Sequence, residues 1–294
     1  MGRIIALGPG QAQTDPSIRI GRLVGIRFSS RICRRCEYCL AGTEQYCSGP
    51  STNHLHHEDG AFQEYIALDT GYLTLLPDDC DPVVTGPVLC AGLTAYKAVL
   101  NAELGVGDWV VVVGAGGGLG QFAVQYALAR GARVLGVDSG DVKREFVTGM
   151  GASFVDFKQT RDLVGDIVTA TGGGAHAAIV TAGSPQAYKA AADMLRVGGV
   201  LSACGIPPGG GKMESAMATI VIKGLKIKGN LVGNLKECLE AVDQVRTGIV
   251  KPRIFVRRFR DLPAVYEELE RGDVAGRIVL KIGEDPLANG KSKL

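Results

Sequence analysis

The feature that most constrains this chain is a glycine-rich segment at residues 110–138. It opens with an apolar run, residues 110–113, whose length and β-branched side chains favour a strand buried on both faces. Five glycines follow between positions 114 and 120, and apolar residues then recur at helical spacing as far as Gly131. A second apolar strand, residues 133–137, ends at Asp138. This strand–turn–helix–strand order predicts a dinucleotide-binding unit.

The residue types in this unit suit the chemistry of a dinucleotide. Glycines let the backbone approach a pyrophosphate, and the helix N-terminus offers free N–H groups to it. The spacing of Gly114, Gly117 and Gly120 is G-x-x-G-x-x-G rather than the stricter G-x-G-x-x-G. An acid after the second strand can bind a ribose diol, so Asp138 favours NAD over NADP.

Composition bounds the possible partners. With 294 residues, 46% of them hydrophobic, the chain can bury the core of one large domain or two moderate ones. A net charge of +2 gives no reason to expect nucleic acid or an acidic membrane surface as a partner. No apolar run approaches the ~20 residues of a membrane span, and the first ten residues are too weakly apolar for a secretory signal. We therefore expect a cytoplasmic protein.

The rest of the chain has two kinds of pattern. Up to residue 76 it predicts β-structure with long loops, including strands at residues 3–7, 23–28 and 62–68, and residues 87–100 then predict one helix. After Asp138, strands and helices alternate, which implies a parallel sheet with right-handed crossovers. The helices expected there are residues 143–149, 162–170, 186–195, 235–246 and 263–271, and the strands are 154–155, 177–180, 200–204, 225–229, 254–256 and 277–282.

Four of the eight cysteines lie close together, at Cys33, Cys36, Cys39 and Cys47. Thiolates at this density favour a tetrahedral zinc over disulfides, and four thiolates leave no position for water, so such a zinc would be structural. An iron–sulfur cluster is the competing interpretation, although the last spacing does not fit the ferredoxin pattern.

Other candidate ligands are scattered. Cys80, Cys204 and Cys238 are most simply small buried residues, and sequence chemistry alone also places Cys90 in the core. Residues 53–59 contain His54, His56 and His57 with two acids; such a set can bind zinc, but in a polar stretch it is more often a solvated loop. His176 is expected to be a loop residue before a strand.

Taken together, these stretches resemble the zinc-containing medium-chain alcohol dehydrogenases, and most of all their fungal, yeast-like members. The similarity extends over residues 2–282, and the segments that carry it are CRRCEYCLAGTEQYC, DGAFQEYIALD, PVLCAGLTAYKAVL, GAGGGLGQFAVQYALARG and VAGRIVL. The resemblance implies a Rossmann doubly wound parallel sheet inserted in a β-rich, GroES-like catalytic domain. It places the catalytic domain at residues 1–92 and 233–294 and the NAD-binding domain at residues 93–232, with the active-site cleft between them.

The resemblance also implies site residues. Cys33, Cys36, Cys39 and Cys47 match the structural zinc ligands, and Cys90 matches one ligand of the catalytic zinc. Asp138 and Lys143 match contacts to the ribose, Thr94 and Ile206 the nicotinamide pocket, and Arg277 the pyrophosphate. The residues that match the phosphate-binding turn are Gly114, Gly117, Gly118, Leu119 and Gly120.

In this family a cysteine and a histidine upstream complete the catalytic zinc site, and GRIIALGPG resembles the strand that follows that histidine. We therefore expect a catalytic domain that is incomplete at its N-terminus, with two of the three catalytic zinc ligands missing. The implied activity is NAD-dependent oxidation of an alcohol to an aldehyde or ketone by a homodimer or homotetramer, impaired in this chain. The alternatives are a zinc-independent NAD(P)H quinone or enone reductase and a non-catalytic dinucleotide-binding remnant.

Overall fold

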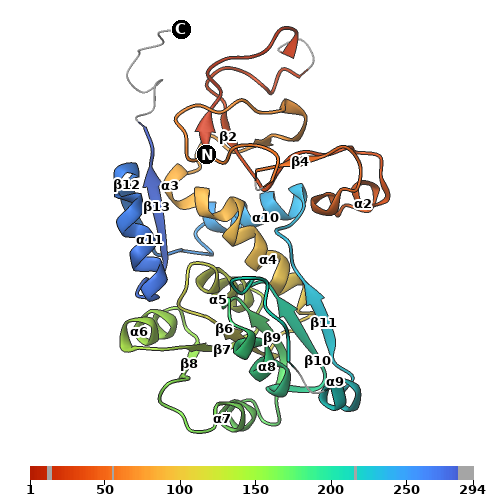
Figure 1. Cartoon of the computed structure of the whole chain (residues 1–294), viewed down its shortest axis with the longest axis vertical. Helices are drawn as coiled ribbons and strands as arrows, with labels where there is room; N and C mark the ends of the chain where they lie inside the picture. Colours follow the sequence, from red (N-terminus) through yellow and green to blue (C-terminus); the bar gives the residue numbers. More distant parts are fainter. Residues whose placement is uncertain (12–14, 55, 215–216, 284–294) are drawn as a thin grey trace.

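The computed structural model describes residues 1–11, 15–54, 56–214 and 217–283, and Figure 1 shows how their elements are arranged. A sheet with its connecting helices forms one end of an elongated molecule, and short strands and loops form the other. Helix α4 (Ala91–Asn101) lies between the two ends, and α10 (Leu235–Arg246) packs against it.

The predicted parallel sheet is confirmed, and it has six strands. Their order is β11-β10-β9-β6-β7-β8, so the chain starts in the middle of the sheet, winds to one edge and then returns to wind to the other. In sheets of this kind, ligands bind beyond the carboxyl ends of the strands at the point where the winding reverses. Here that point lies between β6 and β9. The strands are β6 (Trp109–Val113), β7 (Arg133–Asp138), β8 (Ser153–Asp156), β9 (Ala175–Val180), β10 (Leu195–Ala203) and β11 (Lys226–Gly229).

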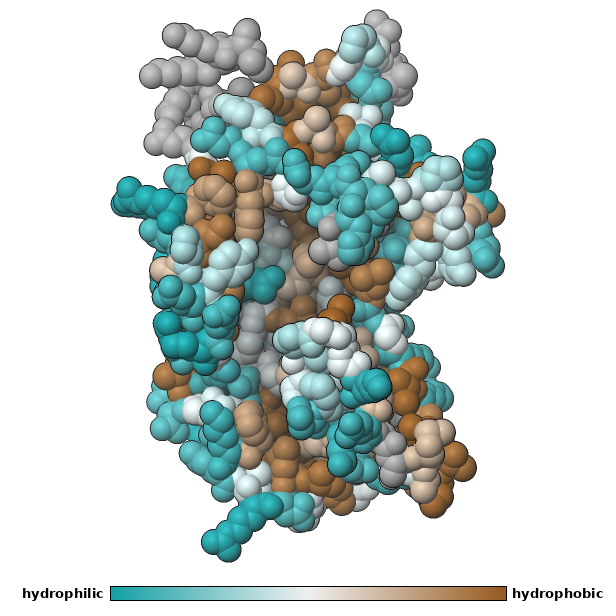
Figure 2. Space-filling view, viewed as in Figure 1, coloured by the Kyte–Doolittle hydropathy of each residue, from teal (hydrophilic) through white to brown (hydrophobic). Residues whose placement is uncertain are grey.

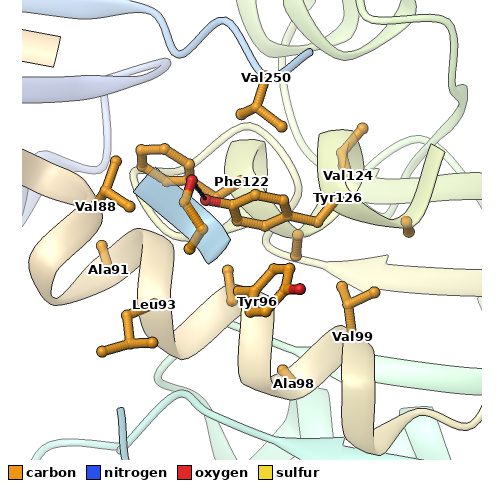
Figure 3. Packing of buried hydrophobic residues seen from close by; sticks show 14 of the residues in the cluster. Val88, Ala91, Leu93, Tyr96, Ala98, Val99, Phe122, Val124, Tyr126 and Val250 are labelled. Atoms are coloured by element: carbon orange, nitrogen blue, oxygen red, sulfur yellow. Dashed lines mark hydrogen bonds between the residues drawn. The ribbon is translucent and has the colours of Figure 1, made fainter. Parts of the chain in front are cut away.

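Strand β6 is buried on both faces, as its continuous valine run predicted. Val110 and Val112 pack into one apolar cluster with α4, whereas Val111 and Val113 belong to a second cluster on the other face. Figure 3 shows aromatic side chains filling the first cluster, where the rings of Tyr96 and Tyr126 meet edge to face at 5.2 Å. The helices that connect the strands are α5 (Gly120–Ala129), α6 (Asp141–Gly149), α7 (Leu163–Ala170), α8 (Pro185–Asp193) and α9 (Met217–Lys223).

The β-rich end has much shorter elements. One antiparallel sheet joins β1, β2 and β5, a second pair joins β3 and β4, and a parallel pair joins β12 and β13 near the C-terminus. These strands are β1 (Gly2–Arg3), β2 (Leu23–Gly25), β3 (Ser29–Arg31), β4 (Thr52–Asn53), β5 (Thr74–Leu75), β12 (Ile254–Arg258) and β13 (Arg277–Lys281). The short helices there are α2 (Glu37–Leu40), η1 (Glu44–Tyr46), η2 (Thr70–Tyr72), α3 (Pro82–Thr85), η3 (Gly86–Leu89) and η4 (Phe259–Asp261), and α11 (Leu262–Arg271) is longer.

Several predicted strands are wrong or too long at this end. The strand predicted at residues 3–7 overlaps β1 only at Arg3, and the one predicted at residues 23–28 already ends at Gly25 with β2. Residues 62–68 form no strand, because no neighbouring strand pairs with them and their aromatic residues are not buried. Phe62 is 55% exposed, and its ring contacts that of Phe259 in a tilted arrangement with the ring centroids 5.9 Å apart. A short apolar segment without a partner strand does not make a sheet.

The helix predicted at residues 87–100 is broken. Cys90 has φ −131° and ψ −72°, outside the helical region, so η3 ends before it and α4 starts after it. The structure thereby leaves Cys90 exposed, and its expected place in the core is wrong. In the described part of the chain no single helix is long and apolar enough to cross a membrane, although one pair bent by 53°, Pro82–Leu89 with Ala91–Asn101, has the length and composition when taken together.

Two smaller expectations also need correction. His176 lies within β9 rather than in a loop, and Leu195 starts β10 rather than ending the preceding helix. Cys80 and Cys238 are buried as expected, whereas Cys204 is only partly buried.

Candidate functional site

The turn between β6 and α5 is built so that only glycine fits at its critical positions. Gly114 has φ +87°, which L side chains rarely adopt. A Cβ on Gly120 would lie 2.0 Å from the carbonyl oxygen of Gly114, so the first turn of α5 packs directly against the end of β6. The turn therefore presents bare backbone at the carboxyl end of the sheet, beside the helix N-terminus.

Asp138 lies at the end of the neighbouring strand β7 and is only 6% exposed. Its carboxylate accepts hydrogen bonds from the backbone of Gly116 (3.0 Å) and Ser139 (2.9 Å), which fix its position against the glycine turn. The Nζ atom of Lys143 donates to the same carboxylate at 3.0 Å. An acid and a lysine are thus held together next to the turn, in the arrangement that a ribose diol requires.

A cavity of about 1010 Å³ opens at this edge of the sheet. It is large enough for a cofactor, since ligand pockets commonly measure roughly 300–1,000 Å³. Seven of the residues predicted to bind the cofactor line it, namely Gly114, Gly117, Gly118, Leu119, Gly120, Asp138 and Lys143. Sequence reasoning missed further lining residues, among them Ser139, Asp156, Phe157, Thr181 and Arg271. The ends of β8 and β9 were a usable signal, because the carboxyl ends of parallel strands share one edge.

Arg277 is not among the residues that line the cavity, but it lies against the same glycine turn. A Cβ on Gly118 would lie 2.9 Å from the Cδ and Nη1 atoms of Arg277, and the backbone of Gly276 donates to the oxygen of Gly116 at 3.0 Å. Burial lowers the pKa of the Arg277 guanidinium. No acid in the described residues forms an ion pair with Arg277. A partly buried cation without a carboxylate partner among the described residues, beside a glycine turn, is suited to a phosphate.

The other predicted site residues are near this region but not in the cavity. Thr94 is 8% exposed and donates its hydroxyl to the carbonyl oxygen of Cys90 at 2.7 Å, in the first turn of α4. Ile206 is 79% exposed, and its carbonyl oxygen lies 3.0 Å from where a Cβ on Gly183 would stand, just beyond the end of β9. The assignment of Thr94 and Ile206 to the nicotinamide pocket therefore stays a prediction.

The four clustered cysteines meet in space. The Sγ atoms of Cys33, Cys36, Cys39 and Cys47 all lie within 4.8 Å of one another. Two of the pairs, Cys33 with Cys39 and Cys36 with Cys47, are 3.9 Å apart. A tetrahedral zinc with Zn–S bonds of ~2.3 Å needs sulfurs about 3.8 Å apart, so the residues fit a four-thiolate zinc site.

Local backbone groups favour the thiolate form that a metal needs. The backbone N–H of Cys39 holds the pKa of Cys36 at about 5, and backbone donors also lower the pKa of Cys33. Burial raises the pKa of Cys39 to about 12, so metal binding there must displace a proton. We define residues 33–47, which contain these ligands, as the cysteine lobe.

No second group of candidate ligands appears in the described residues. Cys90 does not belong to any group of three or more candidate ligands among the described residues, and the described histidines of residues 53–59 form no such group with it. His54 instead lies 3.0 Å from the backbone oxygen of Asp59. His176 bridges two strands, since its Nδ1 accepts from the backbone of Trp109 at 3.1 Å and its Nε2 lies 3.1 Å from Asp108.

Comparisons with known proteins agree with this geometry. Residues 118–247 match the family model of a zinc-binding dehydrogenase, and residues 1–78 match that of an alcohol dehydrogenase GroES-like domain. An alcohol dehydrogenase of Schizosaccharomyces pombe is 37% identical over 284 residues, which cover 96% of this chain and 79% of that protein.

Solved structures are similar over the same extent. The alcohol dehydrogenase of the hyperthermophilic archaeon Aeropyrum pernix is 29% identical, with a TM-score of 0.81 over 90% of this chain and 76% of that one. A structure described as an NAD-dependent alcohol dehydrogenase is 25% identical, with a TM-score of 0.81 over 90% of this chain and 77% of that one.

Proposed function

The chain belongs to the family of zinc-binding alcohol dehydrogenases, and from this premise we propose that it oxidises an alcohol to an aldehyde or ketone with NAD, using the residues described above. The observation that carries the proposal is the cavity at the carboxyl edge of the sheet, where the glycine turn, Asp138 and Lys143 lie together. NAD, when bound there, supplies the acceptor for the hydride.

Different residues are assigned to different parts of the cofactor. The backbone of Gly117, Gly118 and Leu119, with the start of α5, would hold the pyrophosphate, and Arg277 would supply positive charge beside it. Asp138 would accept from the ribose hydroxyls and disfavour a phosphate at that place by charge repulsion, which is the reason to propose NAD over NADP. Thr94 and Ile206 are assigned to the nicotinamide end.

Zinc is assigned to the cysteine lobe, where the sulfur spacing fits it. The described residues do not by themselves form a second zinc site around Cys90.

The domain bounds follow from these assignments. We assign residues 1–92 and 233–294 to the catalytic domain, of which residues 284–294 lie outside the described part, and residues 93–232 to the NAD-binding domain. The eight cysteines are all free among the described residues, which suits a reducing compartment, and we propose the cytoplasm.

A homo-oligomer is supported by one apolar surface. Helix α9 exposes Met217 (71%), Val221 (73%) and Ile222 (79%), and the adjoining edge strand β11 exposes Ile227 (46%). Figure 2 shows hydrophobic atoms gathered at the end of the molecule where Figure 1 places α9. The positive charge of the lysines that would protect this edge is partly neutralised by Glu103, which pairs with both Lys226 and Lys228 at 2.6 Å. A second copy of the chain is the proposed partner. An Ile222→Glu variant that sediments as a smaller species than the parent supports this, whereas a monomeric parent protein contradicts it.

The experiment that tests the function combines binding with turnover. We expect NADH formation with a primary or secondary alcohol, and Asp138→Asn should weaken NAD binding about 10–100-fold, because a hydrogen bond to a charged group contributes about 1.5–3 kcal/mol. Asp141→Asn is the matched control, since Asp141 lines the same cavity but its side chain is 85% exposed.

Three other outcomes would change the assignment. NAD(P)H oxidation with a quinone or enone after complete zinc removal favours a reductase. Dinucleotide binding without turnover on any alcohol, carbonyl or quinone makes the chain a binding protein only. Equal weakening by both asparagine variants contradicts the role given to Asp138.

A further inference from the structure

The segment that links the sheet to α10, residues 230–235, is anchored on the side of the sheet by Asn230. The Nδ2 atom of Asn230 donates to the Oγ of Ser202 and to the oxygen of Ala203, both at 2.9 Å. Its Oδ1 accepts from Asn101 at 2.7 Å. One side chain therefore ties this crossover segment to β10 and to the end of α4.

The cysteine lobe holds the same segment from the other side. The Nδ2 of Asn234 donates to the oxygen of Gly42 at 2.7 Å, and the backbone N–H of Leu235 donates to Glu44 at 2.7 Å. The backbone N–H of Leu231 donates to the hydroxyl of Tyr46 at 3.3 Å. All three lobe residues lie between Cys39 and Cys47, the last two thiolates of the cluster, so their positions depend on the fold of the lobe. Figure 1 shows α10 starting beside the lobe.

The conformation of the segment is not one that it would adopt unaided. Val232 has φ +41° and is 7% exposed, and a buried β-branched residue in the left-handed region is strained. Such strain persists only where the surroundings over-determine the backbone. Here the surroundings are Asn230 on one side and the cysteine lobe on the other.

The segment is also in direct contact with α4. A Cβ on Gly233 would lie 2.6 Å from Leu93, so the backbone passes against that helix. Glu237, at the start of α10, accepts from the backbone of Asn234 at 2.9 Å and pairs with Lys97 of α4 at 2.5 Å. Helix α4 also packs against α5, since a Cβ on Gly92 would lie 3.4 Å from the hydroxyl of Tyr126 and the rings of Tyr96 and Tyr126 lie 5.2 Å apart. Helix α5 itself begins at the glycine turn, with Gly120. A continuous set of contacts thus runs from the cysteine lobe to the cofactor site.

We propose that the cysteine lobe is a positioning element for the dinucleotide site: its zinc-loaded fold, through Gly42, Glu44 and Tyr46, sets the conformation of residues 230–235 and hence the placement of the start of α4. The proposal rests on the proposed function for the identity of the cofactor. Because coupling between two sites is reciprocal, zinc in the lobe should tighten dinucleotide binding, and bound dinucleotide should slow zinc loss.

The test measures amide hydrogen exchange in the reduced protein, with zinc bound and after chelation. We expect exchange at Leu231 and Leu235 to accelerate at least tenfold on zinc removal, while amides of β6 keep their protection. The dissociation constant of NADH, measured by fluorescence, should rise in parallel.

A variant separates this positioning role from the folding of the lobe. Tyr46→Phe keeps the four thiolates and removes the acceptor for Leu231, so zinc content should stay at that of the parent. Exchange at Leu231 should rise about fivefold, the effect of one ordinary hydrogen bond, and NADH binding should weaken two- to fivefold. Tyr38→Phe is the matched control, since Tyr38 lies in the same lobe with similar exposure and should change neither quantity.

Each contrary result is distinct. Unchanged exchange at Leu231 and Leu235 after zinc removal overturns the positioning role, as does a loss of protection that spreads evenly to β6. If the dissociation constant of NADH changes neither with zinc loading nor in Tyr46→Phe, the coupling between the two sites is wrong, while the positioning of residues 230–235 by the cysteine lobe can still hold. A zinc-loaded protein that binds no NADH at all overturns the proposed function and the coupling with it.

Discussion

The two ends of this molecule reach order by different means. The sheet end has strands of four to nine residues, and its central strand is buried on both faces by two apolar clusters. The β-rich end has strands mostly of two or three residues, and its separate small cluster is built on Ile4, Ile18 and Val24. This difference indicates that hydrophobic burial is sufficient to specify the fold of the sheet end. The fold of the β-rich end depends on its metal site and on contacts with the sheet end.

The largest expected effect comes from removing the metal. Structural zinc sites of this kind contribute about 10–16 kcal/mol of apparent binding free energy, and that energy is also folding energy. We expect chelation, or Cys36→Ser, to unfold the cysteine lobe while the six-stranded sheet keeps its protection. Hydrogen exchange followed by peptide mapping checks this. If both ends lose their protection cooperatively at one chelator concentration, the two ends unfold as a single unit and this prediction is wrong.

The second prediction compares two phenylalanines. Phe122 is fully buried in the sheet end, whereas Phe62 is 55% exposed in the β-rich end. Phe122→Ala should lower the free energy of unfolding by about 3–5 kcal/mol, because it removes buried area and leaves a cavity. Phe62→Ala should change it by about 0.5 kcal/mol or less. Thermal and urea melts measure both; comparable losses would mean that the loop around Phe62 is better packed than its exposure indicates.

The third prediction concerns the glycine turn. Gly120→Ala brings a Cβ to within 2.0 Å of a backbone oxygen, so the turn must shift, and we expect a loss of about 1–3 kcal/mol together with weaker NAD binding. Gly149→Ala is the control, because its Cβ would meet nothing within 4 Å at the end of α6 and alanine favours a helix. If Gly120→Ala changed neither the free energy of unfolding nor NAD binding, the turn would not be held against β6.

The smallest effect is expected at the edge of the sheet. Lys226 and Lys228 lower the pKa of Glu103 to about 2, from a usual value of 4.5. A depressed carboxyl pKa stabilises the fold above the unfolded value and loses that contribution as the pH falls from 4.5 towards 2. Glu103→Gln should therefore lower the melting temperature slightly at pH 7 and progressively less below pH 4.5. A difference that stays constant down to pH 3 would contradict the pairing.

The sheet end was predictable from the sequence because its signals are local. A valine run, glycines that no other residue can replace and an acid after the next strand each act through neighbours a few residues away. The edge at which Gly114 and Asp138 meet follows from the parallel pairing of β6 and β7, because the carboxyl ends of parallel strands share one edge. The cysteine cluster was predictable for a similar reason, since its spacing lies within 15 residues.

The remaining features were decided only by tertiary structure. The failed strand at residues 62–68 shows that a predicted strand needs a partner strand, which the local sequence cannot reveal. Cys90 is exposed because the backbone breaks there, and His176 is structural because Asp108 and Trp109 lie beside it across the sheet. The strained Val232, held between Asn230 and the cysteine lobe, depends on contacts up to 192 positions apart, and no local pattern encodes a contact at that separation.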